Sequence, residues 1–157
     1  MPELRTFNQA VGTSVVIDTG ILVEYILATE SGLKIKEMIF SNPFIVSVYI
    51  SPLNLIELYY LFRRKNSKEE TTDIINKVKE LTKVESIEES VEIIGEIKAH
   101  TSFSVVDCSN LALAEKMNIK ALFKHETEID KLIKEEKNLD FITKLVFIDD
   151  FSYYKGK

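Results

Sequence analysis

Cysteine is almost absent from this 157-residue chain, in which Cys108 is the only one. No internal disulfide can form, which agrees with a reducing compartment. Only His100 and His125 could serve Cys108 as a general base, and nothing in the sequence ties either histidine to it. We therefore interpret Cys108 as a small buried thiol rather than a catalytic nucleophile.

Long apolar runs are also missing. Stretches such as LNLIELYYLF fall well short of the roughly 20 residues that cross a bilayer. The opening residues, MPELRTFNQAVGTS, lack the basic and apolar regions of a secretory signal. We expect no membrane span and a cytoplasmic location.

An excess of positive charge is the third absence, because the net charge is −5. Binding of nucleic acid would therefore need a local basic patch or a bridging metal. Arg63, Arg64 and Lys65 are the candidate patch for RNA contacts. The same three residues also suit the last turn of a helix, where cations oppose the helix dipole.

Short apolar strands alternate with helical segments along the chain. We expect strands at 14–17, 44–48, 83–87, 119–123 and 145–148, with helices at 19–29, 30–40, 51–65, 67–81, 88–99, 104–116 and 127–137. This alternation predicts an α/β fold with a mostly parallel sheet covered on both faces. With no repeat and no Gly/Pro-rich linker, the pattern indicates one domain at 14–150 and tails at 1–13 and 151–157.

Three acidic residues stand alone in apolar stretches: Asp18, Glu57 and Asp107. Ionised groups are costly to bury without a partner, and a divalent metal is the simplest partner for several carboxylates. Asp18 directly follows a predicted strand, and Glu126 comes shortly after another. Ligands of parallel sheets collect beyond the carboxyl ends of the strands, so these acids could meet in one metal site.

Each acid also has a structural interpretation. Asp18 suits the N-cap of the following helix, and Asp107 suits a capping box. Glu126 lies in KHETEIDK, which has the composition of a solvated segment. Glu57 is harder to explain in this way, because it is the only charge in ten residues of a largely apolar helix.

The ordered set of segments resembles the PIN domain nucleases, including VapC-like toxins. The matching segments are VVIDTGILVEYIL around Asp18, NLIEL at 54–58, SVVD at 104–107 and KHETEI at 124–129. The resemblance covers about residues 14–150. It implies a Rossmann-like α/β/α sandwich, dependence on Mg²⁺ or Mn²⁺, and cleavage of single-stranded RNA. It also implies an antitoxin protein and a homodimer as partners.

By position, the resemblance assigns the metal and the catalysis to four acids. Asp18, Glu57 and Asp107 match the family's first three acids. Glu126 matches the fourth, which is usually Asp, and its extra methylene places the carboxylate farther from the backbone. Glu128 falls on a further acidic position.

Two accessory positions follow from the same resemblance. Asn54 matches a polar position that could hold a metal's water or a phosphate oxygen. The family often has a hydroxyl residue two positions after the first acid, where this chain has Gly20, while Thr19 keeps a hydroxyl next to it.

Two other functions compete with a nuclease. Gly20 and Glu126 favour a PIN-like fold that serves as an interaction module, or a toxin held inactive by a partner. A phospho-accepting receiver domain would also place an Asp at a strand end. Receivers cluster two acids after the first strand, however, and here Asp18 stands alone before Thr19 and Gly20.

Overall fold

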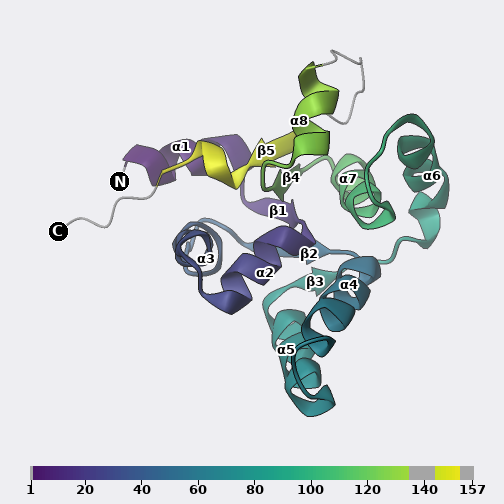
Figure 1. The fold of residues 1–157 in the computed structure, drawn as a ribbon. Helices are drawn as coiled ribbons and strands as arrows, with labels where there is room; N and C mark the ends of the chain where they lie inside the picture. The colour runs from purple at the N-terminus through teal and green to yellow at the C-terminus, as the bar shows by residue number, and fades with distance from the viewer. Residues whose placement is uncertain (1, 135–143, 153–157) are drawn as a thin grey trace.

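The computed structural model describes residues 2–134 and 144–152, and its strands form one five-stranded sheet (Figure 1). The strands are β1 (Ser14–Ile17), β2 (Ser47–Ile50), β3 (Lys83–Val84), β4 (Lys120–Phe123) and β5 (Leu145–Phe147). They lie in the order β3-β2-β1-β4-β5, and all neighbours pair in parallel. The predicted parallel sheet is confirmed, and its direction of winding reverses between β1 and β4.

Helices connect the strands. They are α1 (Pro2–Val11), α2 (Thr19–Leu27), α3 (Glu30–Ile35), the π-helical turn η1 (Lys36–Phe40), α4 (Pro52–Arg63), α5 (Lys68–Leu81), the 3₁₀ turn η2 (Glu88–Ser90), α6 (Val91–His100), α7 (Val105–Met117), α8 (Thr127–Lys134) and the 3₁₀ turn η4 (Ile148–Asp150). No helix among the described residues combines the length and the hydrophobicity that a bilayer crossing needs.

Two hydrophobic cores lie on opposite faces of the sheet. Along β1, the side chains of Val15 and Ile17 enter one core and Val16 enters the other, as the alternation of a strand requires. The first core is closed by α1 to α5, and the second by α6, α7 and α8. The predicted α/β/α sandwich is therefore confirmed.

Caps fix where two of the helices near the site begin. Ser51 accepts a hydrogen bond from the Leu53 N–H at 3.2 Å, and Pro52 occupies the first turn of α4. Ser104 accepts from the Asp107 N–H at 3.1 Å and caps α7. Both helix starts are confirmed, because the sequence placed a small hydroxyl side chain before each apolar helix.

The second strand was predicted three residues too early. Asn42 accepts hydrogen bonds from the Phe44 N–H and the Ile45 N–H, both at 3.1 Å, so these residues belong to a turn. Val46 is then 75% exposed, and pairing with β1 starts at Ser47. The apolar run FIVSV predicts a strand from residue 44, but its first residues belong to the turn and its strand begins only at Ser47. The third strand is likewise shorter than 83–87, ending at Val84.

The prediction of a tail at 1–13 is wrong for the described residues. Leu4, Phe7 and Val11 recur at helical spacing on α1, and Phe7 and Val11 are buried in the first core. Phe7 meets Phe151 edge-on, with ring centroids 5.1 Å apart. Phe151 therefore also packs on the core, whereas residues 153–157 and the predicted helical residues 135–137 lie outside the described part of the chain.

Candidate functional site

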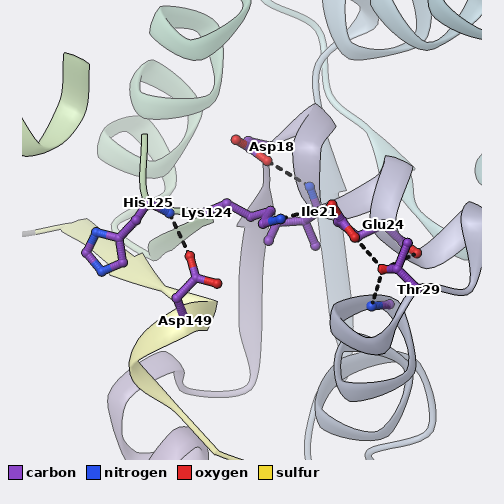
Figure 2. A network of polar contacts seen from close by, with 8 residues as sticks. Asp18, Ile21, Glu24, Thr29, Lys124, His125 and Asp149 are labelled. Carbon is purple, nitrogen blue, oxygen red and sulfur yellow. Dashed lines mark hydrogen bonds and ion pairs between the residues drawn. The ribbon is translucent and has the colours of Figure 1, made fainter. Parts of the chain in front are cut away.

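Asp18 lies at the carboxyl end of β1, where the direction of winding reverses. Its backbone N–H donates to the Leu122 carbonyl of β4 at 3.1 Å, and its side chain is 2% exposed. Its Oδ1 accepts from the Ile21 N–H at 3.0 Å and so caps α2 (Figure 2). The capping interpretation of Asp18 is correct, and the cap also fixes the carboxylate at the sheet edge where ligands collect.

The other three predicted acids lie near enough to Asp18 for their charges to act on it. Burial raises the pKa of Asp18 well above its ordinary value, and the charges of Asp107, Glu126 and Glu57 raise it further. The hydrogen bond from Ile21 acts in the opposite direction. Carboxylates on α4, on α7 and before α8 thus all act on the carboxylate that follows β1.

The other three acids are more accessible than Asp18. Glu57 on α4 is half-buried and accepts a long hydrogen bond from the Tyr60 hydroxyl at 3.4 Å. Asp107 is half-buried in the first turn of α7, and Glu126 is exposed in the loop before α8. The site therefore has one buried carboxylate and three that can be reached from solvent.

A model of the PIN domain family matches residues 15–135. The chain belongs to the PIN domain family. Its sequence matches no curated protein.

Solved structures share the fold of this PIN domain. A toxin–antitoxin complex from Klebsiella pneumoniae has a TM-score of 0.59 at 12% identity, over 85% of this chain and 97% of that chain. VapBC2 from Rickettsia felis, bound to a DNA fragment from its promoter, has a TM-score of 0.62 at 17% identity, over 85% and 98%. Mycobacterium tuberculosis VapC20, a sarcin-ricin loop cleaving toxin, has a TM-score of 0.58 at 16% identity, over 75% and 94%.

The donor set of this PIN domain fits a hard divalent cation. The four candidate ligands offer only carboxylate oxygens, which Mg²⁺ and Mn²⁺ accept, and a cation would relieve the repulsion that acts on Asp18. Within residues 2–134 and 144–152, however, no group of three His, Cys, Asp or Glu side chains is close enough together to hold a metal ion. A shared ion would need the carboxylates of Glu57, Asp107 and Glu126 to lie closer to Asp18 than they do here.

Asn54 is fully buried, and its side-chain amide is hydrogen-bonded inside the protein. Its Oδ1 accepts from the Ser51 N–H and from Asn110, both at 2.8 Å, and its Nδ2 donates to Thr19 and to Asn110, both at 3.0 Å. Asn110 also donates to the Ile17 carbonyl at 3.2 Å. These contacts assign Asn54 to joining α4, α7 and the end of β1, rather than to a metal's water or a phosphate oxygen.

The remaining accessory positions are Thr19, Gly20 and Glu128. The Thr19 hydroxyl is buried and accepts from Asn54. A Cβ at Gly20 would lie 3.3 Å from Asp18 Oδ1, so a side chain at this position would crowd that carboxylate. The side chain of Glu128 lies outside the described residues.

The basic patch occupies the end of α4, about 9 Å along the helix axis from Glu57 at 1.5 Å per residue. Arg63 donates to the Asn66 carbonyl at 3.0 Å just beyond the helix, and Arg64 lies over the Tyr60 ring at 5.0 Å. Both arginines and Lys65 are exposed. The helix-end interpretation holds for Arg63, and all three side chains remain accessible to a ligand.

Sequence reasoning missed two sets of polar residues at the site. One is Ser109 and Asn110, which are buried on the second turn of α7; the signal was two polar residues inside the apolar run VVDCSNLALA. The other is Glu24 with Lys124, which form an ion pair at 2.9 Å between α2 and the end of β4. Glu24 gave a signal as the only charge in the apolar helix TGILVEYIL, whereas Lys124 begins the charged segment KHETEIDK and gave none. Cys108 is buried as predicted, and burial raises the pKa of its thiol.

Proposed function

We propose that this PIN domain is a divalent-metal-dependent endoribonuclease of the toxin type that cleaves single-stranded RNA. The observation that carries the proposal is the buried Asp18, whose pKa is raised by burial and by three further carboxylates from separate segments. Such a concentration of negative charge at the ligand-binding edge of a parallel sheet is typical of a functional site.

In this proposal Asp18, Glu57, Asp107 and Glu126 hold Mg²⁺ or Mn²⁺. A bound cation would polarise the phosphodiester and supply an activated water. Asp18 anchors the site, because its cap on α2 and its burial leave it little freedom. Glu57, Asp107 and Glu126, which are more accessible than Asp18, would complete the set of ligands.

RNA as the substrate is supported by the chain's family and by the printed description of VapC20 as a sarcin-ricin loop cleaving toxin. An acidic protein needs a local cationic surface to hold a polyanion, and the exposed Arg63, Arg64 and Lys65 provide one. We assign these residues to phosphates that flank the cleaved bond.

A protein partner is the second part of the proposal. Two structural neighbours, from Klebsiella pneumoniae and Rickettsia felis, are toxin–antitoxin complexes. We infer that this chain binds an antitoxin and acts in the cytoplasm. We also infer a homodimer, which size-exclusion chromatography with light scattering would test.

The decisive test is cleavage of a labelled single-stranded RNA with Mn²⁺ or Mg²⁺, with and without EDTA. We expect EDTA and Glu57→Gln to stop cleavage. Cys108→Ala, which removes the buried thiol, and the matched variant Asp73→Asn, at an exposed acid on α5, should not stop it. Metal-free Glu57→Gln should be at least as stable as wild type, because the variant removes one repelling charge.

EDTA-resistant cleavage would overturn the metal mechanism. A destabilised metal-free Glu57→Gln protein with intact cleavage would overturn the ligand assignment. Binding of a protein partner by a chain that cleaves no RNA would favour the interaction module, for which Gly20 and the exposed Glu126 are the supporting features.

A further inference from the structure

The loop at 124–126, which carries Glu126 from β4 to α8, is tied to helix α2. Lys124 Nζ lies 2.9 Å from Glu24 Oε1, and the two side chains are only 29% and 24% exposed. The Thr29 hydroxyl donates to Glu24, and its oxygen accepts from the Gly32 N–H of α3 at 3.0 Å. Figure 2 shows this chain of contacts running from Lys124 to the corner between α2 and α3.

The same loop is tied on its other side to the end of the sheet. The His125 N–H donates to Asp149 Oδ2 at 2.8 Å (Figure 2). The ring nitrogens of His125 lie 2.7 Å from Asp130 and 2.8 Å from Asp150, and its ring stacks on Phe147 at 4.0 Å. The two residues that precede Glu126 are thus held from opposite directions.

Glu126 is the candidate ligand that most needs such support. Asp18 is fixed by burial and by its cap, while Glu57 and Asp107 project from helices. Glu126 belongs to a loop and its side chain is exposed, yet its charge acts on Asp18. The backbone of residues 124–126 therefore sets where its carboxylate can reach.

We propose that the Glu24–Lys124 ion pair and the His125–Asp149 hydrogen bond are positioning contacts that hold Glu126 at the acid cluster. The inference rests on the proposed metal-dependent function. Partly exposed ion pairs contribute little to stability, so the consequence of this one is geometric. Residues that orient metal ligands typically change metal affinity or activity by about 10- to 100-fold when they are replaced.

The test compares Lys124→Met and Glu24→Gln with wild type in a Mn²⁺ titration followed by thermal melting, and in RNA cleavage. We expect Mn²⁺ binding to weaken about 10- to 100-fold and kcat to fall with little change in KM for RNA. The matched control is Lys116→Met, which breaks the 3.1 Å Lys116–Glu89 ion pair and should leave both readouts unchanged.

A double-mutant cycle decides whether the ion pair acts through Glu126. In a Glu126→Gln background, Lys124→Met should cause no further loss of Mn²⁺ affinity. The charge swap Glu24→Lys with Lys124→Glu should restore affinity, because it rebuilds the pair. Wild-type affinity in both single variants, fully additive losses in the cycle, or a swap that fails to restore affinity would overturn the proposal.

Amide hydrogen exchange in metal-free protein separates this inference from the proposed function. Lys124→Met should speed exchange at His125 and Glu126, and Lys116→Met should not. Unchanged exchange would overturn the positioning role even in an active nuclease. A wild-type protein that neither binds Mn²⁺ nor cleaves RNA would overturn the proposed function, whatever the exchange rates show.

Discussion

Replacing Asn54 by Ala should destabilise the whole domain through the buried amide network. The substitution removes four hydrogen bonds, those to Ser51, to Thr19 and two to Asn110. Asn110 Nδ2 still donates to the Ile17 carbonyl. Three groups lose the partner that Asn54 provides: the Ser51 N–H, Asn110 Oδ1 and the Thr19 hydroxyl oxygen.

A buried polar group that loses its partner costs about 1–3 kcal/mol, so the three groups together predict a loss of about 3–9 kcal/mol. That is a large part of the roughly 5–15 kcal/mol that stabilises a typical domain. Urea denaturation should show the midpoint falling with an unchanged slope. The control is Asn76→Ala on the exposed face of α5, for which a change within about 0.5 kcal/mol is expected.

A loss below about 1 kcal/mol for Asn54→Ala would refute this reasoning, because each stripped group alone is expected to cost at least that much. The variant should also show a smaller Mn²⁺-induced rise in melting temperature than wild type. The network joins α4 and α7, which carry the candidate ligands Glu57 and Asp107, to strand β1. The candidate ligand Asp18 directly follows that strand.

Three other predictions follow from single features. Metal-free wild type should lose stability as the pH rises from the ordinary aspartate pKa of 3.8 through the raised pKa of Asp18, because the buried carboxylate must then ionise. Asp18→Asn, which can still cap α2, should lack this loss and should abolish the Mn²⁺-induced shift in melting. Arg63→Ala with Arg64→Ala should weaken RNA binding at every sequence and reduce the salt slope by about 1–2, measured by fluorescence anisotropy. Gly32→Ala should lower the melting temperature, because its Cβ would lie 1.9 Å from the Glu24 carbonyl oxygen; an unchanged melting temperature would show that α3 can shift freely.

The local sequence determined most of the elements and the identity of the acids. Ser51 with Pro52, and Ser104, predicted helix starts correctly because a cap depends on neighbouring residues alone. Asp18 and Glu57 could be singled out for a similar reason, since a lone charge in an apolar segment is visible without any structure. The failures at β2 and α1 were also local in origin: the turn around Asn42 and the helical spacing of Phe7 and Val11 were present in the sequence and were misread.

Only the tertiary structure decided which residues meet. The order β3-β2-β1-β4-β5 places β4 beside β1, although Asp18 and Lys120 are 102 positions apart in the chain. This pairing brings Glu126 near enough for its charge to act on Asp18. The Asn54–Asn110 pair and the Glu24–Lys124 pair likewise join residues 56 and 100 positions apart. A side chain's sequence neighbours set its propensity and its cap, whereas its burial, its partners and its pKa depend on atoms from distant segments that packing alone brings into contact.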